Sequence, residues 1–176
     1  REIVDERDLD DLLMRRGGHF GALLASALDP TAALAGQRWG ILAAWPPLLL
    51  RLPRLAAQGT IELPAAWLRH ADLTATQFAA GLPEEPVQRF YGKLIDQIRR
   101  RLDELRTAHP ISIALLPHRL ELALSMRRLE RWQGRGFEAS TAQQALPPLR
   151  RLGVLWRMAR RHRQDVRRGQ RRLSQP

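Results

Sequence analysis

The stretch GQRWGILAAWPPLLLRLPRLAAQGTIELP, from Gly36 to Pro64, decides the predicted fold. Its first part, Trp39 to Trp45, is apolar and predicts a helix. The adjacent Pro46 and Pro47 each remove a backbone donor and clash with the preceding turn. The helix is therefore expected to break or kink there. A proline-interrupted segment of leucines and arginines then leads to a compact turn at Gly59 to Pro64.

Outside this stretch, helical patterns alternate with short breaks. The longest clean helix is predicted over 84–107, where apolar residues recur at three- and four-residue spacings. Further helices are predicted over 12–28, 111–132 and 149–162, with breaks such as His109-Pro110 between them. The sequence therefore predicts an all-α bundle of about six to eight helices.

Length and composition favour one domain. A chain of 176 residues, 44% of them hydrophobic, can bury one sizeable core. We expect a single helical domain over 1–162 and an Arg-rich, disordered tail over 163–176. The absence of cysteine excludes disulfides and cysteine-based metal sites, and favours a reducing compartment. The longest uncharged apolar run, 39–50, is shorter than the roughly 18 residues of a spanning helix, so a cytoplasmic protein is expected.

The net charge of +11 is concentrated at the C-terminal end. Residues 146–176 hold ten arginines and one acid, Asp165. Such a segment can contact the phosphates of anionic lipid or nucleic acid. A solvated helix end that frays explains it as well. No aromatic-interleaved patch or helix-turn-helix spacing supports nucleic-acid binding, so peripheral contact with an anionic membrane is the favoured partner of the tail.

The stretch 36–64 resembles the second signature of the squalene/phytoene synthase family. In that family a helix beginning Gly-Ile-Ala carries two aspartates one turn apart, and a Gly-Arg-x-Tyr-Leu-Pro hairpin follows. In a gapless alignment on Gly59 and Pro64, Gly40-Ile41 falls on the family's Gly-Ile, and the two aspartates fall on Arg51 and Leu55. The resemblance implies an isoprenoid-synthase-type helical bundle.

The replaced aspartates remove the metal chemistry that the resemblance implies. Head-to-head prenyl transfer ionises an allylic diphosphate, and Mg²⁺ held by carboxylates stabilises the leaving group. Arg51 and Leu55 cannot bind Mg²⁺, although Arg51 and Arg54 are candidates for direct phosphate contact. Thr60 and Glu62 stand where the family hairpin has its arginine and tyrosine. No catalytic residue, metal or other cofactor is therefore expected, except Mg²⁺ if the chain is an enzyme after all.

The resemblance also implies a pocket for an isoprenoid tail. The run 17–22 lies on the family's glycine-bearing helix, where small residues make room for the tail; close helix packing would explain the same glycines. The strongest parts of the resemblance are 36–41, 59–68 and 116–156. The chain therefore corresponds to the C-terminal two-thirds of a family member, and the first aspartate-rich motif would lie upstream of Arg1. The expected pocket residues are Gly18, His19, Phe20, Gly21, Gly40, Ile41 and Trp45.

Three functions remain open at this point. The first is a degenerate family member that keeps the helical cavity, binds an isoprenoid, another lipid or a protein partner, and performs no prenyl transfer. The family implies a precedent, because members without the aspartates include a respiratory complex I assembly factor. The second is a prenyltransferase seen as a fragment, or completed by a partner subunit. The third is binding of anionic membrane or nucleic acid through 160–172. The sequence favours the first.

Overall fold

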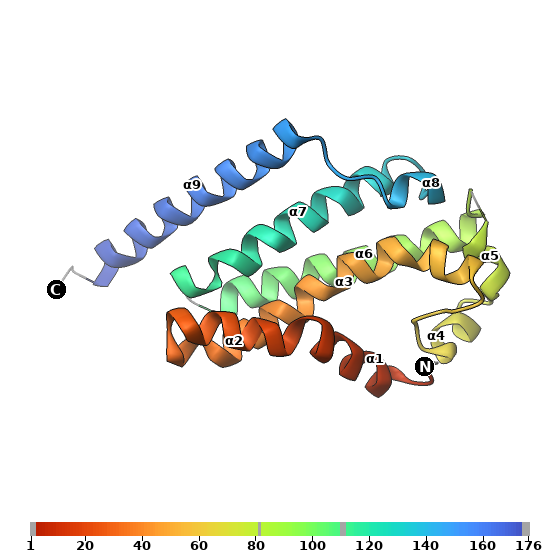
Figure 1. Cartoon of the computed structure of the whole chain (residues 1–176), viewed down its shortest axis with the longest axis horizontal. Coiled ribbons are helices and arrows are strands. Elements are labelled where there is room, and N and C mark those ends of the chain that lie inside the picture. The colour runs from red at the N-terminus through yellow and green to blue at the C-terminus, as the bar shows by residue number, and fades with distance from the viewer. Residues whose placement is uncertain (1–2, 81, 110–111, 174–176) are drawn as a thin grey trace.

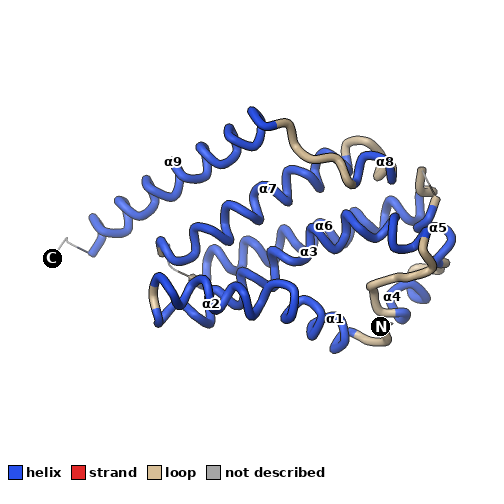
Figure 2. The backbone as a smooth tube through the Cα atoms, in the orientation of Figure 1, coloured by secondary structure: helices blue, strands red, loops and turns tan. Residues whose placement is uncertain are grey.

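The computed structural model describes residues 3–80, 82–109 and 112–173, with side chains described up to Gln164. In that part of the chain all regular structure is helical, which confirms the all-α class (Figure 1, Figure 2). The α-helices are α1 (Glu6–Leu13), α2 (His19–Leu28), α3 (Ala33–Ala57), α4 (Ala65–His70), α5 (Ala75–Ala79), α6 (Glu85–Ala108), α7 (Leu116–Gln133), α8 (Ala139–Ala142) and α9 (Pro148–Leu173). Every helix in the described residues is too short or too polar to span a bilayer.

Helix α3 is the centre of the bundle. It runs between α2 on one side and α6 and α7 on the other, and α9 lies outside α7 (Figure 1). Thirteen of its 25 residues are buried. A helix that is apolar on most of its circumference is stable only when other elements surround it. The stretch that decides the fold is thus also the centre of the core.

The predicted break at Pro46 and Pro47 is wrong. Helix α3 continues through both prolines, and through Pro53, to Ala57. An interior proline costs about 3 kcal/mol or more in an isolated helix. Beyond the pair, however, Leu48, Leu49 and Leu50 are at most 2% exposed, and burial of such a side chain contributes roughly 1.5–3 kcal/mol. The packing of the leucine run therefore offsets the cost of the prolines.

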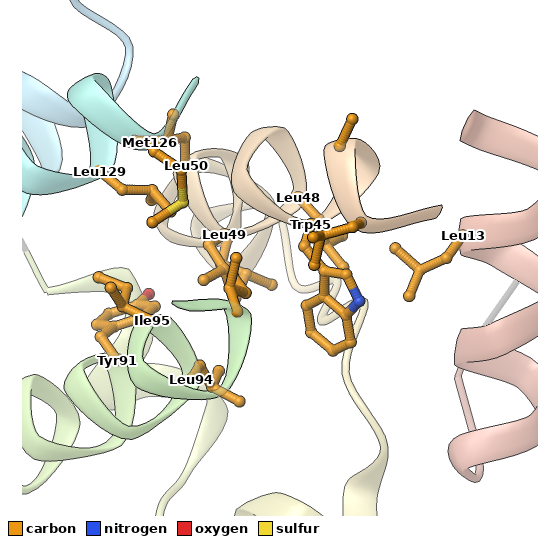
Figure 3. Packing of buried hydrophobic residues seen from close by; sticks show 14 of the residues in the cluster. Leu13, Trp45, Leu48, Leu49, Leu50, Tyr91, Leu94, Ile95, Met126 and Leu129 are labelled. Carbon is orange, nitrogen blue, oxygen red and sulfur yellow. The ribbon is translucent and has the colours of Figure 1, made fainter. Parts of the chain in front are cut away.

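The leucines of α3 reach different neighbours. Figure 3 shows Leu50 beside Met126 and Leu129 of α7, whereas Leu48 lies on the side that faces Leu13. All five belong to one continuous hydrophobic cluster. The chain on both sides of α3 is therefore held together through this one helix.

The other helices differ from prediction mainly at their ends. Helix α6 occupies 85–108, one residue from the predicted span. The first helix begins at Glu6 rather than at Leu12, and reaches α2 through a π-helical turn, Met14–Gly18. Helix α9 was expected to end near His162, but its backbone is helical to Leu173, where a disordered tail was predicted. Residues 174–176 of that tail lie outside the described residues.

Candidate functional site

Glycines of α3 pack directly against glycines of α2 and of the π-helical turn that precedes α2. A Cβ atom built on Gly21 would lie 2.3 Å from the carbonyl oxygen of Gly36, and one on Gly40 would lie 2.2 Å from that of Gly17. Both neighbours are backbone atoms, so the two helices already touch main chain to main chain. We call Gly17, Gly21, Gly36 and Gly40 the glycine seam.

The seam leaves no room for a ligand at the glycines predicted to line a pocket. Gly21 and Gly40 lie in the contact itself, and a Cβ on Gly18 would meet the Met14 sulfur at 2.5 Å and Ile41 at 3.0 Å. His19 and Phe20 point outward, and Phe20 is 61% exposed. These five residues are therefore corrected from pocket lining to helix packing or surface.

His118 of α7 joins the seam from the side. Its side chain is 1% exposed, and its Nε2 lies 3.2 Å from the Gly21 carbonyl oxygen. A carbonyl only accepts, so Nε2 carries the proton and donates. Burial lowers the pKa of His118 below its usual value, although the bond to Gly21 and the charge of Glu121 act in the opposite direction. Neutral His118 is therefore the form that fits the folded protein.

We expect acid to weaken the fold through His118. The folded-state pKa lies below the unfolded value of 6.5, so the unfolded chain binds more protons between the two values. The stability that the folded protein gains from neutral His118 is fully present above pH 6.5. It is lost as the pH falls through the folded-state pKa. Urea unfolding from pH 7.5 to about pH 5 should show a smaller fall in stability for His118→Gln than for the wild type. His70→Gln, at an exposed histidine, is the control, and an equal fall in all three proteins would contradict the assignment.

Two predicted pocket residues, Ile41 and Trp45, do line a hollow. It lies between α3 and α6 and has a volume of about 360 Å³. Arg101 covers it, with its guanidinium carbon 5.7 Å from the centroid of the Trp45 ring. Trp45 also stacks on Trp67, with centroids 6.2 Å apart. The hollow is a shallow apolar surface with a cation above it.

Arg51, one of the two positions aligned with aspartates of the resembled family, belongs to an ion-pair network. The Glu62 carboxylate accepts from Arg16 at 2.9 and 2.5 Å, and Nη2 of Arg51 lies 3.5 Å from the same carboxylate. Arg51 therefore faces a carboxylate, while Arg54 is exposed and Leu55 is half-buried. Of the two predicted phosphate contacts, Arg51 would have to exchange Glu62 for the phosphate. Among the described residues no group of three or more acidic or histidine side chains is placed to hold a metal ion.

A second cavity, of about 320 Å³, is bounded by α6, α7 and α9, with Trp39 of α3. We call it the arginine cleft. Its apolar lining consists of Trp39, Leu102, Leu122, Ala123, Met126, Val154 and Met158. Its charged lining consists of Arg99, Arg106, Arg119, Arg127, Arg157 and Arg161, with Asp103 and Glu130. Six cations against two acids give the cleft a net positive charge.

Each of the two acids of the cleft forms an ion pair with an arginine of its own helix. Asp103 lies 3.3 Å from Arg106, and Glu130 lies 2.7 Å from Arg127. These side chains are between 39% and 76% exposed, and exposed pairs of this kind contribute only about 0.3–0.5 kcal/mol. An incoming anion can therefore compete for these arginines at low cost.

Two further features suit the cleft to an anion attached to an apolar group. Arg119 lies with its guanidinium carbon 6.0 Å from the Trp39 ring centroid, and its Nη1 is 3.0 Å from Nδ1 of the buried His162. The indole Nε1 of Trp39 is buried and has no acceptor among the described residues. The Trp39 ring and its apolar neighbours would contact the hydrocarbon of such a ligand.

The arginine cleft was not predicted from the sequence, although the spacing of its arginines is visible there. Arg99, Asp103 and Arg106 follow one another at four and three residues on α6, and Arg157 and Arg161 are one turn apart on α9. Such arginines are usually interpreted as a solvated face. Only the packing of the three helices turns them toward a common space.

Chemically, the cleft can bind the phosphate of an amphiphile. Guanidinium groups bind phosphate oxygens in a planar, bidentate manner, and their charge does not depend on pH in the physiological range. A volume near 300 Å³ is at the lower end of the range for ligand pockets.

Comparison of the chain with protein-family models, with curated proteins and with solved structures gave no match.

Proposed function

We propose that this chain is a squalene/phytoene synthase-like protein that binds a phosphate-bearing isoprenoid or related lipid and does not join prenyl groups. The arginine cleft carries the proposal. It combines six arginines with an apolar lining in one cavity, and a lipid phosphate has the matching two parts. In this proposal the helices form an isoprenoid-synthase-type bundle.

The contact between Arg51 and Glu62 supports the relation to that family. The gapless alignment places Arg51 on an aspartate of the helix and Glu62 on the tyrosine of the hairpin, eleven residues apart. Their side chains meet in the structure, as facing positions of one site would. A cation now occupies the place of the metal-binding carboxylate, and a carboxylate occupies the place of a phosphate contact. This exchange of charges favours a protein that binds a phosphate-bearing ligand but does not ionise a diphosphate with the help of a metal.

Calorimetric titration tests the proposal. We expect farnesyl diphosphate to bind more tightly than inorganic diphosphate or farnesol, because only the first uses both parts of the cleft. Binding should not require Mg²⁺, and no longer prenyl product should form. A Mg²⁺-dependent C30 product would establish the enzyme alternative. Absence of binding by all three ligands would contradict lipid binding and favour a role as an assembly or scaffold protein.

We expect loss of two cleft arginines to weaken farnesyl diphosphate binding at least about tenfold, since each charged hydrogen bond contributes roughly 1.5–3 kcal/mol. The variant is Arg106→Gln on α6 with Arg157→Gln on α9, both of which line the cleft. The matched control is Arg89→Gln with Arg100→Gln, which removes the same charge from α6 outside the cleft. Equal weakening by both variants would indicate general attraction by the positive protein, and the cleft assignment would then be wrong.

A further inference from the structure

Helix α9 presents large apolar side chains to solvent. Leu149 is 83% exposed, and Leu152 and Trp156 are each 62% exposed. At 100° per residue these positions fall within about 60° of the helix circumference, so they form one stripe. Val154 and His162 are buried on the other side of the helix. Figure 1 shows α9 at the edge of the bundle, next to α7.

The same face of α9 becomes cationic toward its C-terminal part. Arg160 and Arg163 fall in the sector of the stripe, and the Arg160 guanidinium carbon lies 5.3 Å from the Trp156 ring centroid. From Pro148 to Gln164 the sequence has six arginines and no acid. The outer face of α9 therefore offers an apolar half and a positive half to one partner.

The charge distinguishes between the partners that could cover this face. A second copy of the chain docked in parallel through the same face would bring arginines against arginines, which is repulsive, and an antiparallel copy would leave the arginines without a counter-charge. Nucleic acid would neutralise the arginines but leave Leu149 and Leu152 in water. An anionic bilayer surface satisfies both halves, because the apolar side chains enter the headgroup boundary while the arginines contact lipid phosphates.

We infer that α9 lies on the surface of an anionic bilayer, with Leu149, Leu152 and Trp156 at the level of the headgroups. Trp is a side chain that favours this level, since its ring is apolar and its N–H is polar. The inference goes beyond the proposed lipid binding, because it rests on the outer face of α9 and not on the arginine cleft. Val154 and Met158, on the inner face, line the cleft, so docking would hold the cleft close to the membrane.

A single fluorescent label tests the inference, because the chain has no cysteine of its own. A polarity-sensitive fluorophore is attached to Leu152→Cys, and, as a matched control, to Leu23→Cys on α2, where Leu23 is 70% exposed. With phosphatidylcholine vesicles that contain phosphatidylserine, we expect a blue shift for the label at position 152 and none at position 23. Pure phosphatidylcholine and high salt should reduce the response.

Two variants separate the halves of the face. Arg160→Gln with Arg163→Gln should weaken binding to the anionic vesicles about tenfold, and Leu149→Ser with Trp156→Ser should weaken it by a similar factor. All four side chains are exposed, so the unfolding midpoint should stay unchanged. Equal responses at positions 152 and 23, or no response to vesicles, would overturn the inference. A response to an oligonucleotide alone, or to protein concentration alone, would replace it by nucleic-acid binding or self-association.

Discussion

Replacing Gly21 by alanine is expected to lower the free energy of unfolding by about 3 kcal/mol, at the upper end for an overpacked site. The new Cβ would lie 2.3 Å from the Gly36 carbonyl oxygen and 3.0 Å from the Cα of Gly40. Both are backbone atoms, so neither can move aside by a rotamer change. Helices α2 and α3 would have to separate, and the bond from His118 to the Gly21 carbonyl would be strained.

The control for this change is Gly92→Ala on α6. A Cβ on Gly92 meets nothing within 4 Å, so the substitution should stabilise the protein by about 0.5–1 kcal/mol through helix propensity alone. Urea unfolding followed by circular dichroism measures both variants. If Gly21→Ala were as stable as the wild type, the close approach of α2 and α3 would be wrong.

Replacing Trp132 by alanine is expected to cost about 4 kcal/mol, because it opens a large cavity in an aromatic cluster. Trp132 is 1% exposed and contacts Tyr91 and Phe137, with ring centroids 4.7 and 5.0 Å away. Its Nε1 donates to the Glu138 carbonyl at 3.0 Å, so the change also removes this hydrogen bond, although Thr141 still donates to the same carbonyl.

Trp156→Ala provides the comparison, since the same side chain is removed at a site that is 62% exposed. Its effect should stay within about 0.5 kcal/mol. Thermal or urea unfolding of both variants at one pH gives the difference. Similar losses in the two variants would mean that Trp132 does not hold α6, α7 and the turn at Phe137 together.

The sequence predicted best where local pattern and packing agree. Helix α6 has one apolar stripe and one wet face, and its span was predicted to within one residue. Helix α3 shows the opposite case, because prolines such as Pro46 and Pro47 normally interrupt a helix when only the local sequence is considered. They fail to do so here because α2, α6 and α7 pack around α3, and a single sequence does not reveal which helices will surround a given run.

The candidate site was predicted less well, for a related reason. The resemblance pointed to the glycines of α2 and α3, and these glycines bring the helices into contact instead of leaving space between them. The arginines of the cleft come from α6, α7 and α9. Each is unremarkable on its own helix, and only the tertiary arrangement makes them neighbours.

The glycine seam also bears on the order in which the chain assembles. Its members lie on α2 with the π-helical turn before it, and on α3, and a short 3₁₀ turn, Pro30–Ala32, joins α2 to α3. Little loop entropy is therefore lost when they meet. Contacts between segments that are close in sequence form early in folding. The α2–α3 hairpin is therefore suited to act as the folding nucleus onto which the later helices condense.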